Sequence, residues 1–283
     1  MEKIKLNDGT EIPAIGFGTF RIPADGSTYR AVREALAAGY RHIDTAMAYR
    51  NEEEVGRALS DSGIPRGEVF ITSKLWLTHF GYERAKKGIE RSLAKLGTDY
   101  IDLYLIHQPY GDIPGAWKAL EEGKAAGKLR SIGVSNFTVN YWKAFAPHFE
   151  VMPSVNQIEC HPLAQQKEIR SFLEPMGVRT ECWGPLGQGN PTLLGNQTLL
   201  EIAEKHKKDV GQIILRFEVS EGMIVLPKSV RPERIRSNLD IFDFSLSEEE
   251  REAIRALDRG AVKRDPETPG IREYLLEKYP IED

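Results

Sequence analysis

The chain has 283 residues, a formal net charge of −4, 28% charged side chains and 41% hydrophobic ones. This composition is that of a soluble globular protein with a large core, and a single α/β barrel can be this long. The basic residues are scattered rather than gathered into a stripe, which argues against nucleic acid as a partner.

The ends and the cysteines of the chain exclude further classes. The first residues, MEKIKLNDGTEIP, hold no apolar targeting segment, and no run approaches the roughly 18 apolar residues that a membrane span needs. We therefore expect a cytoplasmic protein with no membrane partner. Cys160 and Cys182 are too few for a disulfide framework and lack the spacing of metal ligands, so we expect buried free thiols.

The chain begins with a predicted hairpin and continues with alternating strands and helices. Residues 4–6 and 11–13 flank Asp8-Gly9, a strong hairpin signal. The predicted strands that follow cover residues 14–18, 41–44, 69–73, 101–106, 131–134, 154–158, 178–182 and 223–226. The helical patterns cover residues 27–38, 52–60, 82–96, 114–126, 138–145, 166–175, 198–220 and 232–239.

Eight strand-then-helix units predict a closed parallel (β/α)8 TIM barrel, because strands such as IDLYLI are apolar on both faces. An open doubly wound sheet is the alternative, but no GxGxxG follows the first strand. No repeat or low-complexity segment interrupts the pattern, so we expect one domain over residues 1–283. Residues 247–257 predict an extra helix, and residues 260–283 a tail draped over one end.

Polar residues stand at the ends of the predicted strands. In such a barrel the C-terminal strand ends share one rim, where catalytic residues lie. These positions hold Asp44, Lys74, His107, Ser135, Asn136, Asn156, Gln157, Trp183, Lys228 and Ser229. Each alone has a structural explanation, such as a helix cap or a core histidine. Their convergence on one rim favours a functional site.

Four of these residues suit proton transfer to an oxygen. Tyr49 follows Asp44 in the next loop, and a tyrosine with an ordinary pKa of about 10 needs that pKa lowered to exchange protons near neutrality. The ammonium of Lys74 would lower it, and Asp44 would hold that cation in place. His107 could donate a hydrogen bond to a substrate oxygen. The set suits carbonyl reduction, with the hydride coming from elsewhere.

The stretch PKSVRPERIRSN after the eighth strand predicts an anion site. Pro232 is a good first-turn residue, yet Arg231 and Arg234 place cations where they oppose the helix dipole. An anion bound there, with Lys228 and Ser229, would explain them. A solvated basic face is the alternative. The cations suit a 2′-phosphate, which favours NADPH over NADH.

Trp183 lies in the glycine-rich segment CWGPLGQG, just after the seventh strand. Its indole offers a flat apolar surface for an aromatic ring, and the glycines let backbone approach a ligand closely. A tryptophan there could equally plug the top of the barrel, and the residues alone leave both interpretations open.

These motifs resemble the aldo-keto reductase family. The resemblance covers residues 16–244 and rests on GYRHIDTAMAYRNE, ITSKLW, YIDLYLIHQP, GVSNF, VNQIECHP, WGPLGQG and LPKSVRPERIRSN, in the family's order. It implies an (α/β)8 barrel preceded by a hairpin, NADPH bound without a Rossmann domain, and reversible reduction of aldehydes and ketones. The WGPLGQG version looks like the bacterial branch that contains 2,5-diketo-D-gluconate reductases.

The resemblance also implies roles for individual residues. The catalytic tetrad would be Asp44, Tyr49, Lys74 and His107, with Tyr49 as general acid. Ser135, Asn136 and Gln157 would bind the nicotinamide carboxamide, Trp183 would stack on its ring, and residues 184–188 would line the pyrophosphate. The full cofactor set is Thr19, Asp44, Ser135, Asn136, Gln157, Trp183, Gly184, Pro185, Leu186, Gly187, Gln188, Lys228, Ser229, Val230, Arg231, Arg234 and Asn238. The substrate set is Phe20, Tyr49, Trp76, His107 and Gln108.

The sequence departs from the family pattern at several positions. Ser237 replaces a common glutamate near the adenine, and Gln108 and Phe20 replace common tryptophans. The segment 109–115 is short, which suggests an open pocket for small carbonyls.

We thus expect a monomeric, metal-free, NADPH-dependent reductase whose partner is a small-molecule carbonyl substrate: an aldehyde, an α-dicarbonyl such as methylglyoxal, or a keto sugar. Two alternatives belong to other classes. One is a non-enzymatic NADPH-binding barrel, and the other is a metal-dependent hydrolase built on His42, Asp44, His107 and His161.

Overall fold

The computed structural model describes residues 2–281, and its centre is an eight-stranded parallel sheet whose strands follow one another in chain order. They are β3 (Phe17–Gly18), β4 (His42–Asp44), β5 (Phe70–Leu75), β6 (Ile101–Ile106), β7 (Leu129–Ser135), β8 (Val155–Glu159), β9 (Arg179–Trp183) and β10 (Ile224–Leu226). The sheet closes because the Val225 amide donates to Ala14 O at 2.9 Å and the Gly16 amide to Val225 O at 2.8 Å. The predicted (β/α)8 barrel is confirmed.

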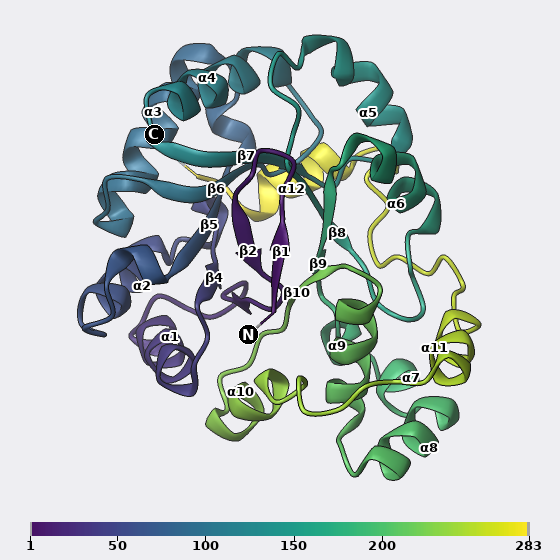
Figure 1. Cartoon of the computed structure of the whole chain (residues 1–283). Coiled ribbons are helices and arrows are strands. Elements are labelled where there is room, and N and C mark those ends of the chain that lie inside the picture. Colours follow the sequence, from purple (N-terminus) through teal and green to yellow (C-terminus); the bar gives the residue numbers. More distant parts are fainter. Residues whose placement is uncertain (1, 282–283) are drawn as a thin grey trace.

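Helices surround the barrel on the outside (Figure 1). Those close to the predicted bounds are α1 (Ser27–Ala38), α2 (Glu52–Ser60), α3 (Tyr82–Leu96), α4 (Ile113–Ala125), α5 (Val139–Phe145), α6 (Lys167–Leu173), α10 (Pro232–Leu239) and α11 (Glu248–Arg255). In α3 the buried residues Ala85, Ile89, Leu93 and Leu96 recur every three or four positions, so one apolar stripe faces the barrel. Cys160 and Cys182 are free and buried, as expected.

The single helix predicted over residues 198–220 is wrong. The chain forms α8 (Gln197–His206) and α9 (Val210–Ser220), separated by Lys207 in the left-handed conformation with φ of 54°. Asp209 and Gln212 form a capping box, in which each side chain accepts a hydrogen bond from the other residue's amide. This start signal is present in the sequence, and it outweighs the continuous apolar pattern.

The two ends of the barrel are covered by different parts of the chain. The predicted hairpin, β1 (Lys3–Lys5) with β2 (Glu11–Pro13), is confirmed. Ile12 of β2 and Leu6, which follows β1, belong to a buried cluster with residues of the barrel strands, among them Phe70, Val155 and Ile224. In Figure 1 the hairpin lies in front of the strands and α12 behind them.

The tail is more ordered than the sequence indicated. It holds α12 (Ile271–Lys278), and the short helix α7 (Pro191–Leu194) was also not predicted. The Trp76 indole donates to Tyr279 O at 2.9 Å, and the Tyr110 hydroxyl donates to Pro266 O at 2.6 Å. The tail is therefore tied to the loops at the C-terminal strand ends, and only its residues 282–283 lie outside the described part. Within residues 2–281 no helix is long and apolar enough to cross a membrane.

The close approach of α2 and α3 depends on Gly56. A methyl group there would lie 2.4 Å from Leu96 O, a backbone atom that cannot move alone. We predict that Gly56→Ala lowers the free energy of unfolding by about 1–3 kcal/mol, measured by urea denaturation. Gly67→Ala is the control, because nothing lies within 4 Å of the position that a methyl group would take there. Equal stability of the two variants would contradict this account of the packing.

Candidate active site

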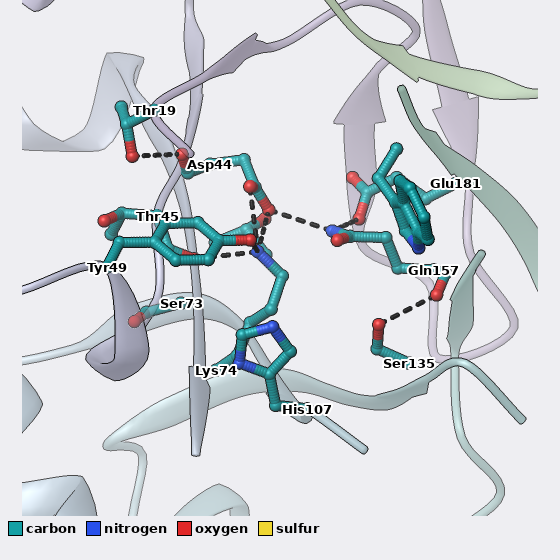
Figure 2. Close-up of polar contacts among 12 residues, drawn as sticks. Thr19, Asp44, Thr45, Tyr49, Ser73, Lys74, His107, Ser135, Gln157 and Glu181 are labelled. Atoms are coloured by element: carbon teal, nitrogen blue, oxygen red, sulfur yellow. Dashed lines mark hydrogen bonds and ion pairs between the residues drawn. The ribbon is translucent and has the colours of Figure 1, made fainter. Parts of the chain in front are cut away.

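A buried ion pair forms the floor of the site (Figure 2). Lys74 Nζ, from β5, lies 2.8 and 2.7 Å from the two carboxylate oxygens of Asp44, the last residue of β4. It also donates to Thr45 O at 2.9 Å and to Tyr49 Oη at 3.2 Å. Lys74 is completely buried and Asp44 nearly so. The ammonium is thus fixed directly beneath the phenol.

Burial and charge oppose each other within this pair. Burial raises the pKa of the Asp44 carboxyl, and the Lys74 ammonium offsets that rise only in part. Burial lowers the pKa of Lys74, but Asp44 and Tyr49 outweigh that effect and raise it overall. Lys74 therefore stays charged, and it is this charge that keeps Asp44 ionised next to it.

A short 3₁₀ helix places Tyr49 over the lysine. This helix, η1 (Met47–Tyr49), ends at Arg50, which has a left-handed φ of 59°. The Tyr49 ring has its centroid 4.8 Å from Lys74 Nζ, 5.0 Å from the Phe20 ring and 5.7 Å from the His107 ring. These contacts hold the ring so that its hydroxyl meets the ammonium.

The expected lowering of the Tyr49 pKa is wrong for this structure. Burial raises the pKa of Tyr49 to about 12, and the Lys74 ammonium only partly offsets that rise. Lys74 acts in the expected direction, but the sequence does not show that loss of solvent around the phenol outweighs the effect of the ammonium. Tyr49 is therefore protonated at neutral pH and can serve as a proton donor.

His107 follows β6 and stands beside Tyr49 as a neutral imidazole. Burial, aided by the Lys74 charge, lowers its pKa well below the ordinary value. The Trp76 ring packs edge-on against it at 5.0 Å. Within the described chain His107 Nδ1 has no hydrogen-bond partner. A neutral imidazole in this place has one N–H to offer to a ligand oxygen.

A cavity of about 680 Å³ opens above the floor and extends from Trp76 and His107 to α10. This size is typical of small-molecule sites. Most of the predicted site residues line it; those that do not are Thr19, Lys74, Asn156, Gly187, Val230 and Arg231. Thr19 is buried and donates to Asp44 O at 2.9 Å, whereas Val230 and Arg231 are exposed.

Hydrogen bonds organise the polar residues beside Trp183. The Ser135 hydroxyl donates to Gln157 O at 2.8 Å, and Asn136 Nδ2 donates to His107 O at 3.0 Å. The Trp183 indole donates to Asn136 Oδ1 at 2.9 Å. The indole and the amides are therefore fixed relative to one another before any ligand binds.

The far end of the cavity is positively charged. Lys228 and Arg234 line it, and Arg21 lines the cavity beside Phe20. No carboxylate of the described residues forms an ion pair with any of these three cations. Burial and the nearby Arg21 charge lower the pKa of Lys228. Like charges that repel one another around a cavity are stabilised when an anion such as a phosphate group binds between them. The residues present thus suit a phosphorylated cofactor.

Several residues of the site were missed by the sequence analysis. They are Arg21, Tyr110, Glu181, Lys263, Arg264 and Tyr279. The tail residues carry no strand-end signal, so their position could not be inferred. Glu181 did carry a signal, because it is a charged residue in the middle of a predicted barrel strand, where side chains are expected to be buried.

The residues of the metal-hydrolase alternative are not brought together. His42 Nε2 lies 2.9 Å from Thr72 Oγ1, and burial lowers the pKa of His42 to about 3. His161 is next to Glu159 instead, at 3.6 Å. Among residues 2–281 no group of three histidine, cysteine or acidic side chains is placed to hold a metal ion.

Comparison with known proteins gives consistent matches. The model of the Aldo/keto reductase family matches residues 14–259. A glyoxal reductase of Bacillus subtilis (strain 168) is 45% identical over 91% of this chain and 93% of its own length. MGS-M4, an aldo-keto reductase from a Medee basin deep-sea metagenome library, is 43% identical with a TM-score of 0.91, covering 94% of this chain and 98% of its own. A Gox0644 mutant in complex with NADPH is 41% identical with a TM-score of 0.89 and the same coverage.

The ion pair generates a prediction about stability. Lys74→Met removes the cation and leaves the Asp44 charge buried, so we expect a loss of about 3–5 kcal/mol in the free energy of unfolding at pH 7. The pKa of Asp44 in the folded variant then lies above its unfolded value, so the folded state binds the extra proton and the loss shrinks as pH falls. Urea denaturation at pH 7 and pH 5 measures both effects.

The double variant Asp44→Asn/Lys74→Met provides the control, because it removes both charges. Its free energy of unfolding at pH 7 should lie between those of Lys74→Met and the parent. It should not show the gain in stability at pH 5 that is expected for Lys74→Met. A Lys74→Met variant as stable as the parent at pH 7 would show that the pair does not hold the Asp44 charge.

Proposed function

Because the chain belongs to the aldo/keto reductase family, we propose that it reduces aldehydes, α-dicarbonyls or keto sugars to alcohols with NADPH, with Tyr49 as general acid. The family match, the glyoxal reductase relative and the NADPH-bound neighbour support NADPH-dependent carbonyl reduction. The observation that carries the proposal is the Tyr49 hydroxyl at the cavity floor, 3.2 Å from an ammonium that a carboxylate holds in place.

Each residue of the tetrad has a distinct part in the reaction. NADPH, when bound, supplies the hydride that reaches the carbonyl carbon. The neutral His107 donates a hydrogen bond to the carbonyl oxygen and aligns it with Tyr49. Tyr49 gives its proton to that oxygen, and the adjacent Lys74 ammonium stabilises the phenolate that remains. Asp44 keeps the ammonium charged and in position.

The raised pKa of Tyr49 favours the direction of reduction. With a pKa of about 12 the phenol holds its proton at neutral pH. An alkoxide is a stronger base than this phenolate, so transfer of the proton to the developing alkoxide is downhill. In the opposite direction the phenolate would first have to form, which burial disfavours.

The proposed cofactor residues form a path along the cavity. Ser135, Asn136 and Gln157 would hold the carboxamide and Trp183 would stack on the ring, with residues 184–188 along the pyrophosphate. Lys228 and Arg234 would bind the 2′-phosphate, together with Ser229 and Asn238, which line the same end. Thr19, Gly187, Val230 and Arg231 stay in the proposal without support from cavity contacts.

Aromatic side chains would form the walls for the substrate. Phe20 and Trp76 face the Tyr49 and His107 pair, and Tyr279 from the tail lies 6.0 Å from the Trp76 ring. Gln108 adds a polar group to this wall. A small carbonyl compound with both apolar and polar parts suits such a pocket. Membership of the 2,5-diketo-D-gluconate reductase branch stays a prediction.

Turnover assays test the proposed activity. NADPH oxidation, followed by absorbance, should be measured with methylglyoxal, 2,5-diketo-D-gluconate, an aromatic aldehyde and a simple ketone, beside NADH. We expect turnover that prefers NADPH, and the ranking of substrates will describe the pocket. Tight NADPH binding without turnover of any of them would instead support the non-enzymatic binding barrel.

Removal of the Tyr49 hydroxyl should abolish proton donation. We predict that Tyr49→Phe lowers kcat by about 10²–10⁴-fold, the contribution typical of general acid catalysis. The NADPH dissociation constant of the variant should stay within about twofold of the parent value. Tyr82→Phe is the control, because the hydroxyl of Tyr82 is on the surface and bonds to Glu122. Near-normal turnover of Tyr49→Phe would refute the assigned role.

Helix α10 offers a matched pair of arginines for the cofactor assignment. Arg234 lines the cavity, whereas Arg236 on the same helix forms an ion pair with Glu34 on the outside. Since a charge-assisted hydrogen bond contributes about 1.5–3 kcal/mol, Arg234→Ala should weaken NADPH binding roughly 10- to 150-fold and NADH binding little. Arg236→Ala should change neither. Equal weakening of both cofactors by Arg234→Ala would contradict the 2′-phosphate assignment.

A further inference from the structure

The amide of Gln157 lies between two buried carboxyl groups (Figure 2). Gln157 Nε2 donates to Asp44 Oδ2 at 2.9 Å and to Glu181 Oε2 at 2.6 Å. All three side chains are nearly or completely inaccessible to solvent. Because a primary amide has two N–H donors, both are used within the barrel.

The opposite orientation of this amide is excluded by electrostatics. Turned over, its carbonyl oxygen would lie against two carboxyl oxygens, one of them on the ionised Asp44. Burial and the Asp44 charge raise the pKa of Glu181 to about 8. When Glu181 is protonated, the proton takes Oε1, because that atom has no partner among residues 2–281 and Oε2 faces the Gln157 N–H. Oε2 therefore accepts from Gln157 whether the carboxyl is protonated or ionised. The geometry therefore fixes which end of the amide faces inward.

The other end of the amide is left for a ligand. Gln157 lines the cavity, and within residues 2–281 no donor bonds to its Oε1. An acceptor that is fixed beside Ser135, Asn136 and Trp183 suits an N–H donor on an aromatic carboxamide.

We propose that Glu181 is a positioning residue: together with Asp44 it locks the Gln157 amide so that Oε1 accepts a hydrogen bond from the carboxamide N–H of the bound cofactor. This role rests on the proposed function, because it needs a nicotinamide in the cavity. Asp44 alone provides one anchor, around which the amide plane can rotate. Glu181 provides the second anchor from the opposite side and removes that freedom.

The other neighbours of the Glu181 carboxyl do not compete with Gln157 for it. Its nearest basic group is His42, whose Nε2 is 3.7 Å from Glu181 Oε1. That imidazole is neutral, because burial lowers its pKa to about 3. The carboxyl is thus engaged by Gln157 alone among the described residues. A buried carboxyl without such a partner is costly.

Cofactor binding gives a direct test that does not depend on turnover. Dissociation constants are measured by quenching of tryptophan fluorescence for NADP⁺ and for its 3-acetylpyridine analogue, in which a methyl ketone replaces the carboxamide. The analogue lacks the N–H donor, so the parent protein should bind it roughly 3- to 10-fold more weakly, the range for one neutral hydrogen bond. Equal affinity for the two cofactors would overturn the proposal on the parent protein alone.

Variants then assign the effect to Glu181. Glu181→Leu should bring the ratio of the two dissociation constants close to 1, whereas Glu181→Gln should keep it, because its amide oxygen still accepts from Gln157. Glu181→Met replaces the leucine variant if that one does not fold. Glu218→Leu is the matched control, since Glu218 is equally buried, in α9, and lies outside the cavity.

The outcomes separate this inference from the proposed function. The positioning role is supported if the ratio of the two dissociation constants falls close to 1 in Glu181→Leu and stays at the parent value in Glu218→Leu. An unchanged ratio in Glu181→Leu overturns that role and leaves NADPH-dependent reduction intact. Failure of the parent protein to bind either cofactor would contradict the proposed function itself, and the inference with it.

Discussion

The buried ion pair between Lys74 and Asp44 is the interaction on which the rest of the site depends. Two charges removed from water are stabilised only when their geometry and their other hydrogen bonds are nearly complete. The barrel meets this condition: Lys74 Nζ has four oxygen neighbours, and Asp44 also accepts from Gln157. The cation so fixed holds Tyr49 by its hydroxyl, and its charge helps to keep His107 neutral. Burial is the larger cause of the protonation of Tyr49 and of the neutral state of His107, and the ion pair adds to the second effect while it opposes the first.

The walls around this floor come from distant parts of the chain. The loop after β3 contributes Phe20 and Arg21, the glycine-rich segment after β9 lines the same cavity, and the tail brings Tyr279 against Trp76. In Figure 1 the tail helix α12 and the hairpin lie on opposite sides of the barrel strands. The hairpin end of the barrel is thus closed by packing, and the proposed site lies at the other end, where the strands end.

Much of this arrangement could be predicted from the sequence, because strand periodicity and strand ends are local signals. The eight-unit pattern predicted the barrel, and the residues at the strand ends placed Asp44, Lys74, His107 and Gln157 on one rim. Features that depend on how distant segments pack around a side chain could not be predicted from these local signals. The rise of the Tyr49 pKa reflects the packing of the strands and loops around the phenol, which removes solvent from it. The place of Tyr279 reflects how the tail folds back, and the break between α8 and α9 was missed despite a legible capping box at Asp209.

The central claim is that hydride passes from the cofactor to the carbonyl carbon while Tyr49 protonates the oxygen. The most direct measurement uses NADPH carrying deuterium at both positions of nicotinamide C4, with methylglyoxal as the probe substrate and mass spectrometry of the alcohol formed. We expect one deuterium on the former carbonyl carbon for each NADPH oxidised, and formation of this alcohol about 10²–10⁴-fold slower with Tyr49→Phe. Oxidation of NADPH without deuterium in the alcohol would contradict it.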